Sequence, residues 1–398
     1  MNNKNYGDLS LEMHKKLRGK LEVIAKCPLE TVDDLSIAYT PGVAKSCLEI
    51  AKNAELAYDY TIKGHTIAVV TDGSAVLGLG NIGATAALPV MEGKAALFKR
   101  FANIDAVPIC LNTQDVDEIV RTVSLIAPGF GGVNLEDICA PRCFEIERRL
   151  NQELDIPVFH DDQHGTAIVV GAALLNVCRY RKQELENFRI VINGAGAAGT
   201  AICKMLINLG AKNIVVVDSK GVLNTNRADL IQEKLELAQT LEELNNENPT
   251  ATSLKEALEG ADVFIGVSAP NVVDADMVRN MSDYPVIFAL SNPTPEIMPE
   301  IALKAGAEIV ATGRSDYPNQ INNVLVFPGI FKGALECLAT RITKQMAIAA
   351  TKALAQYIPL AKLSPSRIIP HVFDEGVADI VAAAVSSSWK SSTGNSDG

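Results

Sequence analysis

The chain has 398 residues, which is more than one typical hydrophobic core organises, so two domains are expected. Hydrophobic residues make up 48% and charged residues 21%, as in ordinary globular proteins. The net charge of −11 argues against nucleic acid or an anionic membrane surface as a partner.

The first seventeen residues lack the apolar stretch of a secretory signal, and no apolar run reaches the roughly 18 residues that span a bilayer. The eight cysteines are scattered, mostly within apolar segments, and form no Cys-x-x-Cys pair. We therefore expect a cytoplasmic protein with no membrane partner, whose cysteines are reduced.

In chain order, the first predicted element is a helix with an apolar stripe at Leu9, Met13, Leu17 and Leu21. The elements that follow are a strand over 66–70, a helix over 86–101, a strand over 105–111, helices over 115–126 and 135–150, and a strand over 157–159. Residues 165–178 are small and apolar almost throughout, which indicates a buried helix.

Strands and helices alternate more regularly in the second half. Strands are predicted over 188–193, 213–218, 262–267, 286–290, 308–312 and 324–327. A helix is predicted from the glycine turn at 194–199 to residue 209, and further helices over 253–259, 274–281, 297–305, 330–357 and 374–388. This alternation predicts an α/β protein whose second domain is a Rossmann-type, doubly wound parallel sheet. The expected division is an N-terminal α/β domain over 1–160, the Rossmann-type domain over 161–388 and a disordered tail over 389–398.

A glycine-rich turn lies between the strand over 188–193 and the helix that follows. Its sequence is Gly194-Ala195-Gly196-Ala197-Ala198-Gly199. Such glycines permit a tight turn, close approach of the backbone to a pyrophosphate, and packing of helix on strand. Asp218 ends the next strand, at the spacing of a carboxylate that binds ribose hydroxyls. We interpret the pattern as a dinucleotide site; a helix-packing turn without a ligand is the alternative.

The choice between NAD and NADP stays open, with a weak preference for NAD. The carboxylate of Asp218 would repel a 2′-phosphate, whereas Ser219 and Lys220 can hydrogen-bond to that phosphate and neutralise it.

Four acids from two separate segments are the strongest signal of chemistry: Glu136, Asp137, Asp161 and Asp162. Each pair could cap a helix, which is the simpler explanation. Caps explain poorly why four acids gather close to a dinucleotide turn, where their charges would repel unless a divalent cation relieved them. Oxygen ligands of this kind suit Mn²⁺ or Mg²⁺.

Two further residues have both a functional and a structural interpretation. Lys94, among small and apolar neighbours, is either a surface lysine with a buried stem or a base whose pKa is lowered by burial or by a metal. Tyr39 is either a core tyrosine or an acid at a loop tip. Spacing does not decide between these interpretations.

Several motifs in order resemble those of the malic enzyme family, in its short bacterial-type form, over nearly the whole chain. They are Ala38-Tyr39-Thr40-Pro41-Gly42-Val43-Ala44, Thr71-Asp72-Gly73 with Leu77-Gly78-Leu79-Gly80, Glu92-Gly93-Lys94, Leu135-Glu136-Asp137, Asp161-Asp162 with Gly165-Thr166, Ser291-Asn292-Pro293-Thr294, and Asn322-Asn323-Val324 before Phe327-Pro328-Gly329.

The resemblance implies a role for each matching residue. Glu136, Asp137 and Asp162 are expected to bind the metal, with Asp161 behind them near Lys94. Lys94 is expected to be the general base and Tyr39 the general acid, while Asn292 and Asn323 contact substrate or the nicotinamide.

One departure concerns the substrate carboxylate. Larger relatives have an arginine directly after the Thr-Asp-Gly turn, whereas this chain has Ser74-Ala75. Ser74 and nearby backbone amides are expected to bind the carboxylate instead.

These roles imply oxidative decarboxylation of (S)-malate to pyruvate and CO2 with reduction of NAD(P), together with oxaloacetate decarboxylation. A lyase without net redox change and malolactic chemistry are enzymatic alternatives, and a non-catalytic dinucleotide-binding module is the alternative from another class. By analogy with the family, we expect a homodimer.

Overall fold

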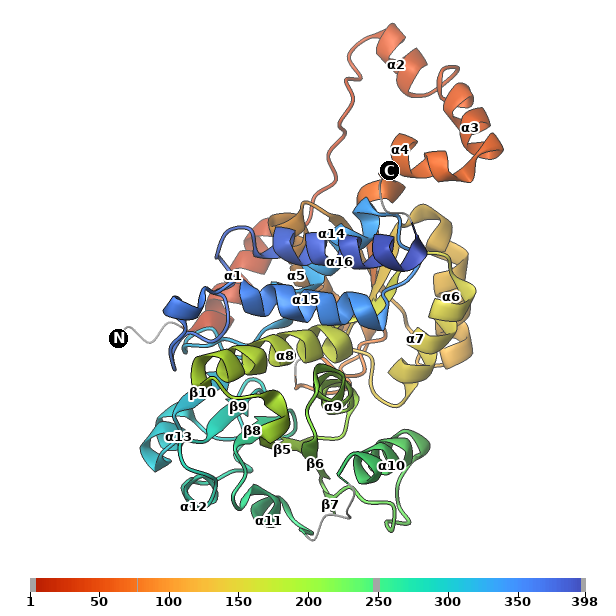
Figure 1. Ribbon diagram of the computed structural model, residues 1–398. Helices are drawn as coiled ribbons and strands as arrows, with labels where there is room; N and C mark the ends of the chain where they lie inside the picture. Colours follow the sequence, from red (N-terminus) through yellow and green to blue (C-terminus); the bar gives the residue numbers. More distant parts are fainter. Residues whose placement is uncertain (1–4, 77, 246–250, 395–398) are drawn as a thin grey trace.

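The structure is a computed structural model that describes residues 5–76, 78–245 and 251–394. It contains two sheets built from parallel strands, and helices cover both faces of each (Figure 1). The expected α/β class, with a Rossmann-type second sheet, is confirmed. Among the described residues, no helix is long and apolar enough to span a membrane.

The first sheet has the order β2-β1-β3-β4, and all its strand pairs are parallel. Its strands are β1 (Thr66–Thr71), β2 (Asp105–Cys110), β3 (Gly132–Leu135) and β4 (Val158–His160). Alternate residues of β1 face opposite sides, so Ile67 packs with α5 (Ala84–Ala102) and Ala68 with α6 (Val116–Ile126) and α7 (Arg142–Glu153). Because both faces are covered, every residue of β1 is buried.

The second sheet has the order β10-β9-β8-β5-β6-β7, parallel except for the short β7. Its strands are β5 (Arg189–Asn193), β6 (Asn213–Asp218), β7 (Gly221–Val222), β8 (Val263–Gly266), β9 (Val286–Ala289) and β10 (Ile309–Thr312). One face packs on α8 (Asp161–Arg181), α9 (Ala197–Leu209) and α10 (Gln232–Asn245). The other face packs on α11 (Leu254–Leu258), α12 (Ala275–Arg279) and α13 (Pro299–Ala305).

One hydrophobic core joins the two sheets. The C-terminal helices α14 (Phe327–Glu336), α15 (Lys344–Gln356) and α16 (Val377–Thr393) lie against α5 and α8 (Figure 1). The rings of Phe98 and Phe327 are 4.5 Å apart between centroids, and Phe331 meets Phe159 of β4 edge to face. Each fully buried phenylalanine contributes about 1.5–3 kcal/mol to folding, so these contacts hold α5 and β4 against the second half of the chain.

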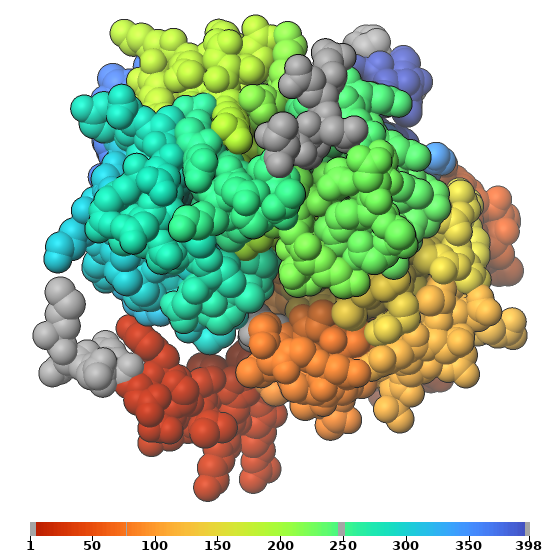
Figure 2. Space-filling model, turned by 90° about the horizontal axis from the view of Figure 1, so that it is seen from below, coloured from red at the N-terminus to blue at the C-terminus, as the bar shows by residue number. Residues whose placement is uncertain are grey.

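The N-terminal segment packs very differently. Helices α1 (Tyr6–Leu17), α2 (Val32–Ala38), α3 (Val43–Lys52) and α4 (Ala57–Tyr60) contain no buried residue. An extended stretch carries α2, α3 and α4 away from the body (Figure 1), and the N-terminal residues project at the edge of the face in Figure 2. The stripe expected at Leu9, Met13, Leu17 and Leu21 is 39–58% exposed.

Short 3-10 helices complete the structure: η1 (Ala54–Leu56), η2 (Ile62–His65), η3 (Ala127–Gly129), η4 (Leu185–Asn187), η5 (Asn323–Leu325) and η6 (Leu360–Lys362).

The predicted helix over 135–150 was wrong at its start. Residues 132–135 form β3, a strand between β1 and β4, and the helix α7 begins only at Arg142. A four-residue strand that contains Asn134 shows too little periodicity to be recognised, while the helical pattern of α7 extends back into it by coincidence.

Three further element predictions require correction. The strand over 324–327 is η5 and the start of α14, since a short apolar run does not distinguish strand from helix. The long helix over 330–357 is two helices, α14 and α15. Of the tail over 389–398 that we expected to be disordered, residues up to Thr393 extend α16, because Trp389 packs against the core; residues 395–398 lie outside the described part.

Candidate active site

A buried lysine and two carboxylates meet at the edge of the first sheet. The Nζ of Lys94, in the middle of α5, is 2.8 Å from Glu136 Oε1 and 2.5 Å from Asp161 Oδ2. Glu136 follows β3 and Asp161 follows β4, and these parallel strands end at the same edge. The ammonium also lies over the ring of Phe327, 4.0 Å from its centroid, so the ion cluster has an aromatic wall.

A second group of acids lies directly beside this pair. One carboxylate oxygen from each of Glu136, Asp137 and Asp162 lies within 4.8 Å of the other two. Asp137 adopts a left-handed φ of 54°, and its backbone N–H donates to Asp162 Oδ2 at 2.8 Å. The turn after β3 and the start of α8 therefore present three carboxylates to one point.

The donor chemistry of this group fits a hard divalent cation. All the available ligand atoms are oxygens, the preference of Mn²⁺ and Mg²⁺. Burial raises the pKa of both Glu136 and Asp162 despite the nearby Lys94. Repulsion from Asp162 raises the pKa of Glu136 further, and repulsion from Asp161 does the same for Asp162. Their ionised forms are therefore short of positive charge, and a divalent cation would supply it.

The electrostatics of Lys94 differ from the expectation. Burial alone would lower the pKa of the ammonium, but the carboxylates of Asp161, Glu136 and Asp162 together raise that pKa above its ordinary value. The pKa of Asp161 is raised to about 6 by burial, which outweighs the attraction of Lys94. Without a cation on the neighbouring acids, Lys94 is thus held in its charged form.

Ser74 lies at this site, but its hydroxyl is already engaged. It donates to Asp72 Oδ1 at 2.5 Å and accepts the backbone N–H of Cys139 at 2.9 Å. Arg142 binds the other oxygen of Asp72, and Ala75 N–H donates to the carbonyl of Asp137. The turn after β1 therefore holds the turn after β3, which carries Glu136 and Asp137, in position. Sequence analysis did not identify this function.

Of the two asparagines expected at the site, Asn323 lies beside it and Asn292 lies against the loop after β1. A Cβ placed on Gly165, one turn into α8, would lie 3.2 Å from the Cβ of Asn323 and 1.9 Å from Asp161 Oδ1. Asn323 therefore borders the turn that carries Asp161. The carbonyl of Asn292 would lie 2.4 Å from a Cβ on Gly78, so it covers the loop after β1.

Tyr39 lies apart from all these residues. It follows α2, which lies on the projecting N-terminal segment (Figure 1). Its side chain is 68% exposed. Within one chain, the structure does not bring Tyr39 to Lys94.

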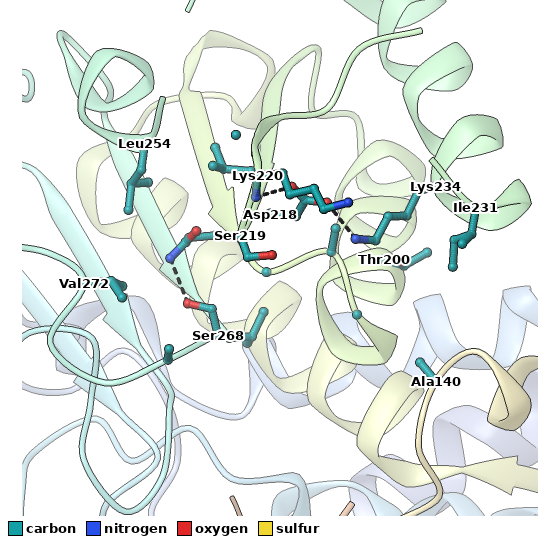
Figure 3. Close-up of a pocket in the computed structure, with 18 of the residues that line it drawn as sticks. Ala140, Thr200, Asp218, Ser219, Lys220, Ile231, Lys234, Leu254, Ser268 and Val272 are labelled. Carbon is teal, nitrogen blue, oxygen red and sulfur yellow. Dashed lines mark hydrogen bonds and ion pairs between the residues drawn. The ribbon is translucent and has the colours of Figure 1, made fainter. Parts of the chain in front are cut away.

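The glycine turn borders a cavity of about 950 Å³ at the end of β5 and β6 (Figure 3). A Cβ on Gly199 would lie 1.7 Å from the carbonyl oxygen of Gly194, so only glycine fits there. Gly196 has no atom within 4 Å of its Cβ position, and with Ala195 it lines the cavity. The turn is followed by α9, which starts at Ala197 and continues with Ala198, and the N–H groups in the first turn of a helix can bind an anion.

Asp218 also lines the cavity, but its carboxylate already forms ion pairs with two basic side chains. Its carboxylate receives both terminal nitrogens of Arg227, at 2.9 and 3.3 Å, and Lys234 Nζ at 2.6 Å (Figure 3 shows the lysine). These partners lower the pKa of Asp218 even though burial opposes them. Lys220 is paired with Asp229 at 3.0 Å.

Sequence analysis did not identify Arg227 and Lys234 as residues of this site. They lie 9 and 16 residues beyond Asp218 with no pattern linking the three, and only the fold brings them together. Ser219 lies next to Asp218 on the cavity wall (Figure 3).

Fold and site together define a two-sheet α/β protein in which a dinucleotide-type cavity accompanies a buried carboxylate–lysine centre. Residues 18–151 match the family description "Malic enzyme, N-terminal domain" and residues 163–388 match "Malic enzyme, NAD binding domain". The chain belongs to the malic enzyme family.

Individual relatives agree with this assignment. The chain is 54% identical to the "Bifunctional malic/malolactic enzyme" of Bacillus subtilis, over 94% of this chain and 91% of that one. It is 52% identical to the "NAD-dependent malic enzyme" of Geobacillus stearothermophilus, over 96% of this chain and 78% of that one. The crystal structure of the NAD-dependent malic enzyme of Thermotoga maritima is 51% identical, with a TM-score of 0.90, over 94% of this chain and 98% of that one.

Proposed function

We propose that this protein catalyses the metal-dependent oxidative decarboxylation of (S)-malate to pyruvate and CO2, with reduction of NAD or NADP, and also decarboxylates oxaloacetate. The observation that carries the proposal is the buried centre of Lys94 and four carboxylates, in a chain that also has a dinucleotide-type cavity. A non-catalytic dinucleotide-binding module would need neither the lysine nor its acids. A lyase without redox chemistry would not need the glycine turn.

Glu136, Asp137 and Asp162 would hold Mn²⁺ or Mg²⁺, and the glycine turn with Ser219 and Lys220 would hold the dinucleotide. When bound, the cation supplies a Lewis acid for the substrate oxygens and the nicotinamide takes up the hydride from C2.

Within this site, Lys94 removes the proton from the C2 hydroxyl of malate. It can do so only when the charges of the neighbouring acids are compensated, since they otherwise keep it protonated. Asp161 positions the lysine at 2.5 Å, and Asn292 and Asn323 contact substrate or nicotinamide. After CO2 leaves, Tyr39 gives a proton to C3, which completes pyruvate.

For the substrate carboxylate, we propose Ser74 and nearby backbone amides of the turn after β1, but all these donors are engaged inside the protein. The hydroxyl and the N–H of Ser74 both donate to Asp72. The N–H groups of Gly73 and Ala75 donate to Thr71 and to the carbonyl of Asp137, so a substrate carboxylate would have to replace one of these hydrogen bonds.

We propose a homodimer in which the projecting segment of one copy covers the other. Apolar side chains of this segment are more than half exposed, which is uncommon for a free surface: Val23, Ile24, Leu29, Val32, Leu35, Ile37, Leu48, Tyr60 and Ile62. Tyr39 lies among them, so a second copy of the chain is the route by which it can reach a lysine centre.

Residues 1–160 and 161–388 are proposed as the two domains, with the boundary at the start of α8. All eight cysteines are free, which supports a reducing compartment, and we propose the cytoplasm.

Malolactic chemistry is a second candidate, because the Bacillus subtilis relative carries that activity in its name and has a similar length. It would convert malate to lactate and CO2 without net reduction of NAD.

Steady-state rates with malate and NAD or NADP, with and without Mn²⁺, test the proposal, with pyruvate, lactate and NAD(P)H measured together. Stoichiometric pyruvate and NAD(P)H that depend on Mn²⁺ would support it. Lactate without NADH would favour the second candidate, and the absence of both products would contradict the enzyme assignment.

A further inference from the structure

A second cavity, of about 420 Å³, lies between α7, α8, α9 and the N-terminal end of α15. Phe144 lines both this cavity and the dinucleotide cavity, so the two are neighbours. None of the functions described above uses this second cavity.

The charges around the second cavity are mainly positive, in a protein whose net charge is −11. Arg148, Lys204 and Lys344 line it from three different helices. Neither lysine forms an ion pair with any residue in the described part of the chain. The one acid in the lining, Glu147, is already bound by His164 Nε2 and by a backbone N–H, each at 2.9 Å.

The end of α15 adds backbone donors to this positive charge. Thr343 caps the helix and accepts the N–H of Met346, so the N–H groups of Lys344 and Gln345 have no partner within the helix. Such groups bind anions, but a helix end alone does not define a site.

An independent observation comes from α8. Gln163 lines the same cavity and is only 3% exposed, yet its amide Nε2 has no hydrogen-bond partner among the described residues. Burying an amide donor without a partner is unfavourable, so its presence points to a bound acceptor. The remaining wall is apolar and includes Phe159 and Met205.

We infer that this cavity binds a small organic anion, with a carboxylate or phosphate group on Lys204, Lys344 and the end of α15, and an apolar body against Phe159 and Met205. The inference does not depend on the proposed enzymatic function, since none of the proposed catalytic or metal-binding residues lines the cavity.

Calorimetric titration of the full-length protein tests this inference, with benzoate and phenyl phosphate as probes and benzamide as the neutral match. The protein is saturated with NAD, because the glycine turn is itself a proposed phosphate-binding site, and Mn²⁺ is left out so that benzoate cannot bind through a metal. We expect one site for each anion and binding of benzamide that is at least about tenfold weaker.

Lys204→Gln and Lys344→Gln should each weaken anion binding by about threefold to fivefold, as expected for partly exposed charges. Lys352→Gln, an exposed lysine further along α15, is the matched control and should leave binding unchanged. Phenyl phosphate binding without benzoate binding would identify a phosphate site, and equal binding would identify a general oxyanion site; both support the inference.

Three outcomes would overturn it: no anion binding at millimolar concentration, equal binding of benzamide, or unchanged binding by the double lysine variant. A change in dimerisation of the lysine variants without anion binding would instead assign the cavity to contact between two copies of the chain.

Discussion

Lys94 is 7% exposed and lies between the carboxylates of Glu136 and Asp161, so its charge is buried and forms ion pairs with both. Replacing it by alanine should lower kcat by a factor of about 10² or more, because the change removes the group proposed to take the proton from malate. NAD binding should be retained, since the cofactor cavity is formed by other residues. Steady-state kinetics and NAD titration measure the two effects.

Lys99→Ala is the control for this variant. Lys99 lies on the same helix but is half-exposed, and among the described residues its ion-pair partner is Asp105, so its loss should change kcat by less than about twofold. A Lys94→Ala protein that is folded and turns over malate at the normal rate would exclude Lys94 as the base.

The proposed metal site makes a separate prediction about binding. Asp162→Asn removes one charged oxygen from the three that lie within 4.8 Å, and it should weaken Mn²⁺ binding at least about tenfold, as seen by electron paramagnetic resonance of free Mn²⁺. Glu145→Gln, an exposed change on α7, should leave Mn²⁺ binding unaltered. Removal of metal by EDTA should abolish turnover; turnover that persists after complete chelation would disprove metal dependence.

The choice between cofactors is predicted to depend on Lys234. Its Nζ and Arg227 neutralise Asp218, which reduces the repulsion that this carboxylate would exert on a 2′-phosphate. Lys234→Gln should therefore lower kcat/KM for NADP by about tenfold, and for NAD by less than about twofold. Lys212→Gln, remote from the cavity, should change neither value. Equal losses with both cofactors would show that Lys234 supports the fold of the cavity instead.

At the residue scale, the sequence predicted the acids better than their surroundings. Glu136-Asp137 and Asp161-Asp162 are adjacent pairs and stand out in any reading of the chain. The hydrogen bonds that occupy Ser74 come from residues two and 65 positions away. Those partners are set by the packing of β1 against β3, which no local pattern encodes.

At the scale of elements, the turn from β5 to α9 gives a prediction with a built-in control. Gly199→Ala places a Cβ 1.7 Å from the Gly194 carbonyl and should shift α9, with a loss of about 2 kcal/mol or more in stability and loss of NAD binding. Gly196→Ala meets nothing within 4 Å, so it should fold normally and weaken only dinucleotide binding. Chemical denaturation and NAD titration distinguish these outcomes. Normal NAD binding by Gly196→Ala would place the pyrophosphate elsewhere.

Regular elements were predictable where periodicity was long and failed where it was short. The strand over 213–218 matches β6 at both ends, because it is an uninterrupted run of β-branched residues between turn signals. The strand β3 has only four residues, and the apolar run over 324–327 is equally suited to a buried helix. The structure of such short segments depends on neighbouring elements: β3, for example, is a strand because it pairs with β1 and β4.

At the scale of the whole molecule, the sequence did not predict that the N-terminal segment projects from the body. Its helices have ordinary caps and apolar residues, and only the absence of a packing partner within the chain distinguishes them. An exposed apolar segment that carries a proposed catalytic residue supports the proposal that a second copy of the chain completes the site, as an isologous dimer allows.

Complementation between two inactive variants tests this arrangement. Tyr39→Phe removes the acid and Lys94→Ala removes the base, so each homodimer should be nearly inactive. If Tyr39 acts on the partner, a dimer of one variant with the other has one complete site, made by Tyr39 of the Lys94→Ala chain and Lys94 of the Tyr39→Phe chain. Unfolding and refolding an equal mixture should give half mixed dimers with one of two sites complete, hence about a quarter of the wild-type rate per chain. Variants refolded separately and then combined show the background. If Tyr39 acts within its own chain, both sites of a mixed dimer stay incomplete and the rate remains at that background, which would contradict a shared site.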